Sequence, residues 1–145
     1  MTTALALPST EEEIWRYSRI NELDMSKFAS GKLTTTVEGG EGVLLNGAAA
    51  TALVGAGMHV QPDVFAQLNT DTPDVIALHI GKNKVHTQTV VITHSVDKSG
   101  VVAYPRLVID ADENSEIVVV ERFTSADNVH SLVVPVVEVH AAQSA

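Results

Sequence analysis

Alternation of apolar and polar residues dominates the second half of the chain. After Asp74, apolar side chains recur at every second position in short runs rich in β-branched residues, as expected of strands with one buried face. These runs are residues 75–80, 89–94, 107–109 and 117–121. Turn-forming residues separate them at 81–83, 97–100 and 112–114. Short strands at near-regular spacing predict a sandwich, a barrel or a β-solenoid.

An internal repeat favours the solenoid among these three folds. Residues 105–111 recur as residues 135–141, an offset of 30 residues, and both copies read Pro, any, aliphatic, any, aliphatic, any, Ala. A solenoid needs such repetition because inward-facing side chains stack from coil to coil. Shared strand propensity alone could also produce the similarity. In the solenoid, Leu107 and Val137 lie in one column.

Helical patterns are expected only before Asp74. Residues 7–17 predict a short helix, because serine, threonine and glutamate occur there at capping-box spacing. A second helical turn is expected at residues 22–28, and residues 1–30 together form a short α-helical N-terminal region. Its simplest role is that of a packed helical cap.

Residues 31–73 predict a mixture of strand, loop and short helix. The expected elements are a weak strand at 32–37, a strand at 43–45 with a tight Asn46-Gly47 turn, an ambiguous segment at 48–57 and a helix at 62–69. Residues 74–145 are then β-helix coils.

The last predicted coil is incomplete. The first copy of the repeat continues into the strand at 116–123, whereas the second copy stops at Ala145. We therefore expect either a fragment of a longer protein, truncated at its C-terminal end, or an end that something else covers. Exposed strand edges invite pairing, so the open β end predicts a possible homo-oligomer.

Composition excludes several classes of function. The net charge is −9, with 18 acidic and 9 basic residues. Without clustered Lys and Arg, neither nucleic acid nor an anionic membrane surface is an expected partner. The absence of cysteine excludes disulfides, thiolate zinc sites and a cluster held by the chain's own sulfurs. Residues 1–8 lack the features of a signal peptide and no apolar run is long enough to span a bilayer, so the expected location is cytoplasmic.

Histidines are the first candidates for a metal site. The chain contains His59, His79, His86, His94, His130 and His140. His79, His86 and His94 lie in consecutive predicted strands and could face one another across coils, as imidazole ligands would. Their spacings match no helical or tight-turn metal motif, and His79 should point outward because Leu78 and Ile80 point inward. We therefore interpret them as histidines on the strand surface.

An acidic turn is the second candidate. It contains Asp110, Asp112, Glu113 and Glu116. Paired carboxylates could perform general acid–base catalysis or hold a hard cation such as Ca²⁺. Turns also favour aspartate for local hydrogen bonds, and a solvated acidic turn is the preferred interpretation. The glycine-rich segments lack a P-loop lysine, and no serine has a nucleophile setting. No catalytic, cofactor-binding or metal residue is assigned, and the chain is not expected to be an enzyme.

Four collinear segments resemble the SufD branch of the SufBD family of iron–sulfur cluster assembly proteins. They cover nearly the whole chain in the family's order. The matching residues are Leu7-Pro8 with Trp15-Arg16-Tyr17; Phe65-Ala66-Gln67-Leu68-Asn69; Leu78-His79-Ile80 through Val90-Val91-Ile92-Thr93-His94; and Pro105-Arg106-Leu107 with Asn114-Ser115 and Val119-Val120-Glu121. No single segment is specific for the family.

The resemblance implies a fold and a role. SufBD-type proteins have a helical N-terminal region, a right-handed parallel β-helix and a helical C-terminal region that binds the ATPase SufC. The β-helices of SufB and SufD pair with each other. The chain would be the N-terminal portion of a non-catalytic scaffold that acts with SufB-like and SufC-like proteins, with SufC contact needing the missing C-terminal region.

The chain also departs from the family. Its members are considerably longer than this chain, and Thr89 stands where they commonly have Pro. The family's residues linked to cluster assembly have no counterpart here. The alternative is a small β-solenoid or β-sandwich enzyme or carbohydrate-binding protein that uses the acidic turn at Asp110 and Asp112.

Overall fold

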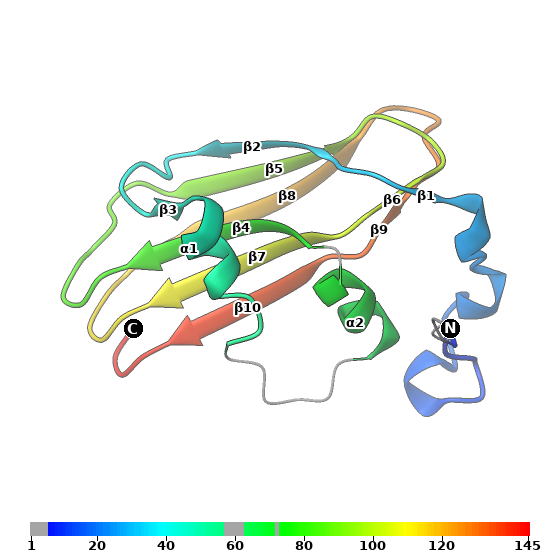
Figure 1. The fold of residues 1–145 in the computed structure, drawn as a ribbon, viewed down its shortest axis with the longest axis horizontal. Coiled ribbons are helices and arrows are strands. Elements are labelled where there is room, and N and C mark those ends of the chain that lie inside the picture. The colour runs from blue at the N-terminus through cyan, green and yellow to red at the C-terminus, as the bar shows by residue number, and fades with distance from the viewer. Residues whose placement is uncertain (1–5, 57–62, 72) are drawn as a thin grey trace.

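The fold is mainly β, as the alternating pattern predicts. The structure, a computed structural model, describes residues 6–56, 63–71 and 73–145. Within these ranges the strands form three sheets, and two α-helices lie before the first long strand (Figure 1).

The largest sheet, here called the β4 sheet, has the order β10-β7-β4-β3. Its strands are β3 (Leu44–Leu45), β4 (Asp74–Ile80), β7 (Pro105–Ala111) and β10 (Val136–Ala141). Strands β4, β7 and β10 run parallel, whereas β3 pairs with β4 antiparallel. Val and Ile are frequent in the long strands, where β-branched side chains fit the pleated surface.

Two further sheets follow the same plan. The β5 sheet has the order β2-β5-β8 and consists of β2 (Thr34–Glu38), β5 (Val90–Val96) and β8 (Val119–Ser125). The β6 sheet has the order β1-β6-β9 and consists of β1 (Ala29–Ser30), β6 (Val101–Ala103) and β9 (Leu132–Val133). Pairing is parallel except between β2 and β5.

Parallel partners after Asp74 lie about one repeat apart in the sequence. Val137 is the register partner of Leu107, so the repeat of 30 residues found in the sequence is confirmed as a strand pairing. His79 and Asp110, 31 residues apart, are partners in β4 and β7. The corresponding separation between β5 and β8 is 29 residues, as in the Ser95–Thr124 pair. Each of the three sheets therefore gains one parallel strand with every repeat of about 30 residues.

The main core lies between the β4 and β5 sheets. Leu78, Val90 and Ile92 are fully buried there, and Leu107 is 3% exposed. The other face of the β4 sheet packs under α1 (Gly47–Ala52), where Ala50, Ala77 and Val108 form a second cluster. Figure 1 shows α1 across this face. Alternation along β4 thus buries both faces of the strand.

One edge of each sheet lacks a neighbouring strand within the described residues. Strands β8, β9 and β10 are the outermost strands at that side, and we call them the open edge. Val137 is 50% exposed although its register partner Leu107 is buried, and Phe123 is 44% exposed. Apolar side chains that would continue the core are therefore uncovered at this edge.

The prediction of α-helices in residues 7–17 and 22–28 is wrong. Three short 3-10 turns occur there instead: η1 (Glu13–Trp15), η2 (Ile20–Glu22) and η3 (Met25–Lys27). Local hydrogen bonds compete with α-helix formation. The Ser18 hydroxyl donates to the Trp15 carbonyl at 2.8 Å, and Asp24 accepts from the Ser26 amide at 3.0 Å.

The predicted 62–69 helix is confirmed with shifted bounds, whereas the predicted Asn46-Gly47 turn is wrong. The predicted 62–69 helix is α2 (Val64–Asp71), and the Asp63 carboxylate accepts from the Ala66 amide at 2.8 Å near its start; Pro62 lies outside the described residues. Asn46-Gly47 does not form a hairpin turn. It starts α1, with Gly47 at a φ of 56° that glycine adopts without strain.

Candidate functional site

Three parallel strands bring two histidines and an aspartate side by side on one face of the β4 sheet. His79 of β4 is the register partner of Asp110 of β7, which in turn is the register partner of His140 of β10. Side chains at one register position project from the same side of a sheet. Leu78 and Ile80 point into the core, so His79 projects from the opposite face, as predicted.

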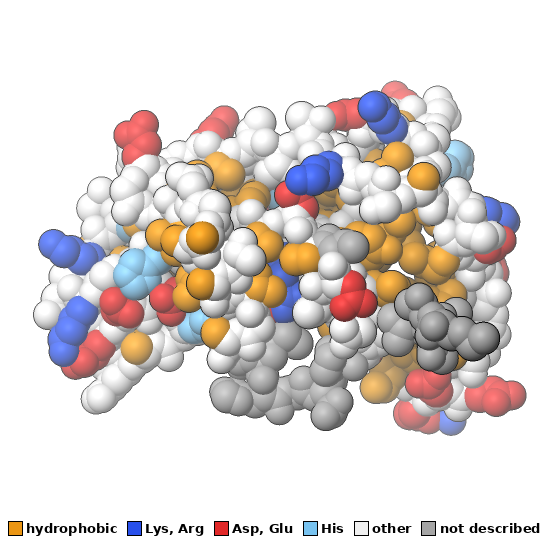
Figure 2. All heavy atoms as spheres, viewed as in Figure 1, with side chains coloured by type: hydrophobic (Ala, Val, Ile, Leu, Met, Phe, Trp, Pro, Cys, Tyr) orange, Lys and Arg blue, Asp and Glu red, His pale blue; other side chains and the backbone are white. Residues whose placement is uncertain are grey.

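Asp110 lies between the two imidazoles. His79 Nδ1 is 2.9 Å from Asp110 Oδ2, and His140 Nδ1 is 3.9 Å from Asp110 Oδ1. Asp112 approaches the other ring nitrogen of His79, with 3.6 Å between Nε2 and Oδ2. We call His79, Asp110, Asp112 and His140 the His–Asp cluster. Figure 2 shows pale-blue and red side chains gathered over the ends of β4, β7 and β10.

Stacked turns position Asp112. The turns after β4 and β7 contain Asn83 and Asn114 at φ of 60° and 55°, a conformation that asparagine tolerates better than most residues. The Asn114 side-chain amide donates to Asn83 Oδ1 at 3.0 Å, and Lys82 pairs with Glu113 at 2.7 Å. These contacts hold the second turn directly beside the first. Asp112 is thereby fixed next to a histidine of the preceding strand.

A hollow of about 510 Å³ borders the cluster. Asp110, Asp112 and His140 supply its polar lining, together with small side chains that include Ala56 and Ala142. His140 Nε2 is buried without a hydrogen bond and lies 3.6 Å from Glu138 Oε2. The cluster thus combines partly exposed carboxylates and imidazoles with space beside them, an arrangement suited to cation binding or proton transfer.

No other histidine in residues 6–56, 63–71 and 73–145 joins this cluster. His86 Nε2 lies 2.7 Å from the Gly39 carbonyl, and His94 lies in the interior, so the three histidines weighed as a metal set have different partners. Glu116 is likewise not in the cluster: it forms an isolated bridge with Val85. His59 lies outside the described residues.

Interpreting His94 as a surface residue is wrong. Its side chain is 4% exposed and shares the inner face of β5 with Val90 and Ile92. Its Nδ1 lies 2.8 Å from Thr35 Oγ1 and its Nε2 lies 3.0 Å from Glu121 Oε1. A buried polar group needs such partners, because an unpaired one costs about 1–3 kcal/mol.

This network has the composition of a nucleophile, base and acid, but its surroundings support a structural role. The ring of His94 stacks on Phe123, with centroids 4.8 Å apart. A hollow of about 230 Å³ reaches Thr35 and His94 between β2, β3 and β4. Asn46 and Asp74 also line this hollow, but both ring nitrogens of His94 already have hydrogen-bond partners. We therefore interpret the network as satisfying a histidine placed in the core.

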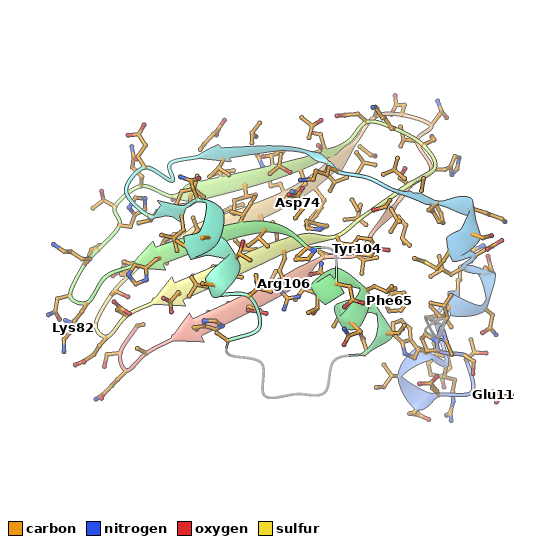
Figure 3. The ribbon with its side chains drawn as sticks, in the orientation of Figure 1. Glu11, Phe65, Asp74, Lys82, Tyr104 and Arg106 are labelled. Atoms are coloured by element: carbon orange, nitrogen blue, oxygen red, sulfur yellow. The ribbon has the colours of Figure 1, made fainter. Side chains whose placement is uncertain are left out.

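A second buried network joins two segments on which the family resemblance rests. Arg106 is fully buried and donates to Asn69 Oδ1 at 3.0 Å and to Thr70 Oγ1 at 3.1 Å. It also forms an ion pair with Glu138, whose carboxylate accepts from the Gly55 amide at 2.9 Å. Figure 3 shows Arg106 next to α2. The helix and the sheet are therefore joined by buried charge-assisted bonds.

Close packing explains why residue 39 is a glycine. Gly39 has a φ of 73°, and a Cβ atom there would lie 2.4 Å from the Thr89 carbonyl oxygen. Only glycine fits this position without displacing the backbone.

Comparisons of the chain with protein families, with curated proteins and with solved structures found no match. Among the described residues, neither α-helix has the length and apolar character needed to cross a bilayer.

Proposed function

We propose that the chain is a non-catalytic scaffold component of iron–sulfur cluster assembly, related to SufD and built on the start of a right-handed parallel β-helix. The observation that carries this proposal is the register. In all three sheets, strands after Asp74 pair in parallel with the strand about 30 residues further along. A β-helix repeats in this way, because each coil lays its strands on those of the coil before.

The family motifs add a second line of support. Asn69 of the Phe-x-x-Leu-Asn segment accepts a hydrogen bond from Arg106 of the Pro-Arg segment, and it donates to the Pro105 carbonyl at 2.9 Å. The two segments on which the resemblance rests are therefore hydrogen-bonded to each other in the fold. Such a contact gives a physical reason for finding both segments in the same protein.

The proposed partners are SufB-like and SufC-like proteins in the cytoplasm. The open edge offers unpaired strands and exposed apolar side chains, which suit pairing with another β-helix. Val139, 61% exposed, is one of these side chains. The family resemblance places contact with SufC in a region that follows the β-helix.

Co-purification tests this proposal. A tagged form translated beyond Ala145 should retain SufB-like and SufC-like proteins from the same genome, whereas the 145-residue chain should not retain SufC. Loss of both partners from the longer form would overturn the proposal.

Sedimentation of the 145-residue chain should also show self-association. Val139→Lys should weaken it, and Ile14→Lys, at a residue 88% exposed and outside the open edge, should not.

The His–Asp cluster favours a second candidate, a small enzyme or carbohydrate-binding protein. The specific observation is that Asp110 and Asp112 lie with His79 beside a hollow. Screening oligosaccharides for binding and hydrolysis tests it: Asp110→Asn and Asp112→Asn should each abolish any activity found. If both variants keep that activity, the acidic turn is not its site.

A further inference from the structure

We propose that the His–Asp cluster binds a divalent transition-metal ion, with His79, Asp110 and Asp112 as ligands and His140 as a fourth. This proposal is independent of the scaffold function. It rests on donor atoms that three strands and a turn bring together on the outer face of the β4 sheet.

The donor atoms already lie close to one another. One ligand atom from each of His79, Asp110 and Asp112 falls within 4.8 Å of the other two. In a tetrahedral site with metal–ligand distances of about 2.0–2.1 Å, neighbouring donors are about 3.3 Å apart. One ion binds only one ring nitrogen of His79, so either Nδ1 at 2.9 Å from Asp110 or Nε2 at 3.6 Å from Asp112 is the donor, and the other carboxylate lies within the 4.8 Å spread of the donor set. Small side-chain rotations would therefore complete the site without moving the strands.

His140 is oriented for a role as the fourth ligand. Its Nδ1 faces Asp110 across 3.9 Å, while its Nε2 faces Glu138 across 3.6 Å. Metal-bound histidines commonly donate their second ring N–H to a carboxylate, which fixes the tautomer and the ring orientation. Glu138 is itself held by Arg106 and by the Gly55 amide. A metal on Nδ1 would leave an N–H on the buried Nε2, which now makes no hydrogen bond, to donate to Glu138.

The donor types select the class of metal. Imidazole nitrogens suit Zn²⁺, Ni²⁺, Co²⁺ and related ions, whereas Ca²⁺ and Mg²⁺ prefer oxygen ligands throughout. Two aspartates balance the charge of a divalent ion. The hollow beside Asp110 and His140 leaves room for bound water or a further ligand. Zn²⁺ and its spectroscopic substitute Co²⁺ are therefore the probes to use.

Titration of the full 145-residue chain tests the site. Calorimetry with Zn²⁺ should give one ion per chain with a dissociation constant on the order of micromolar or tighter. Co²⁺ should produce a visible absorption band that Zn²⁺ removes. Asp112→Asn, in a turn, and His79→Gln should each weaken binding by about 10-fold or more, because loss of a partner that only supports a ligand already costs about 10-fold.

Matched controls separate the cluster from other donors. His86→Gln removes a histidine whose partner is the Gly39 carbonyl, and Asp127→Asn removes an exposed carboxylate of a different turn. Both should bind Zn²⁺ as the parent chain does. Far-ultraviolet circular dichroism should be the same for all variants. Weak, non-stoichiometric binding by the parent chain, or equal losses in controls and cluster variants, would overturn the proposal.

Discussion

Removing the carboxylate of Glu138 should destabilise the chain more than any surface change. Arg106 is fully buried and Glu138 is 5% exposed at the side chain, so their ion pair is shielded from water. In Glu138→Ala the guanidinium would stay buried beside the neutral acceptors of Asn69 and Thr70. The buried positive charge would then lack its counterion.

The expected loss follows from this geometry. Breaking a buried ion pair by removing one partner costs about 3–5 kcal/mol. The Gly55 amide loses its acceptor as well, which is included in that range. For a chain of this size the loss corresponds to a fall in Tm of about 10 °C. Glu138→Gln keeps a neutral acceptor and should lose less.

Urea unfolding followed by circular dichroism measures the free energy of unfolding for each variant. The double variant Arg106→Met with Glu138→Leu tests whether the unpaired buried charge causes the loss of stability, because replacing both charges with apolar groups is often neutral or stabilising. It should be more stable than Glu138→Ala alone. Glu41→Ala, at an exposed acid, is the control and should change the free energy by less than about 0.5 kcal/mol. A loss below about 1 kcal/mol in Glu138→Ala would refute the reasoning.

Three other predictions test the register, the turns and pH dependence. Leu78→Ala should lower the free energy of urea unfolding by about 2–5 kcal/mol, because Leu78 is fully buried. Val137→Ala, half exposed at the open edge, should lower it by much less, and equal losses would contradict the register. Asn114→Ala should lower it by about 1–2 kcal/mol because of its positive φ, more than Asn114→Gly, which keeps the turn conformation. Burial raises the pKa of Tyr104, so the phenol keeps its proton in the folded chain at a pH where it has lost it in the unfolded chain. The free energy of unfolding should therefore fall as the pH rises from about 10 through the folded pKa. Tyrosinate absorbance in Tyr17→Phe, where Tyr104 is the remaining tyrosine, should show a midpoint above about 10, and a midpoint at or below 10 would contradict the burial effect.

The sequence predicts the strands and part of their register. Period-two runs locate β4, β5, β7 and β8 within a few residues, because alternation is a local property. The Pro105 and Pro135 repeat predicts the pairing of β7 with β10. The two-residue strands β1 and β9 leave no periodic signal, because they are defined by distant partners.

The candidate site was predictable only in part. The repeat of 30 residues aligns Asp110 with His140. This alignment is missed when only the prolines and the aliphatic positions of the two copies are compared. Joining His79 to Asp110 requires the offset of 31 residues between β4 and β7, for which no repeated motif exists. The interior position of His94 could have been predicted, because His94 has the same alternation parity as Val90 and Ile92.

The antiparallel strands at the start of the chain have a consequence for folding during synthesis. Thr35 of β2 pairs with His94, 59 residues later, so β2 leaves the ribosome well before its partner. Closing that loop costs only about 0.6 kcal/mol more than closing a loop of half the length. Pairing of β2 with β5 is therefore delayed by the order of synthesis and not by the free energy of loop closure. Until β5 is made, Val37 has no core to enter. Strand β2 would therefore stay unpaired until β5 is made, and chaperones would meet it during that interval.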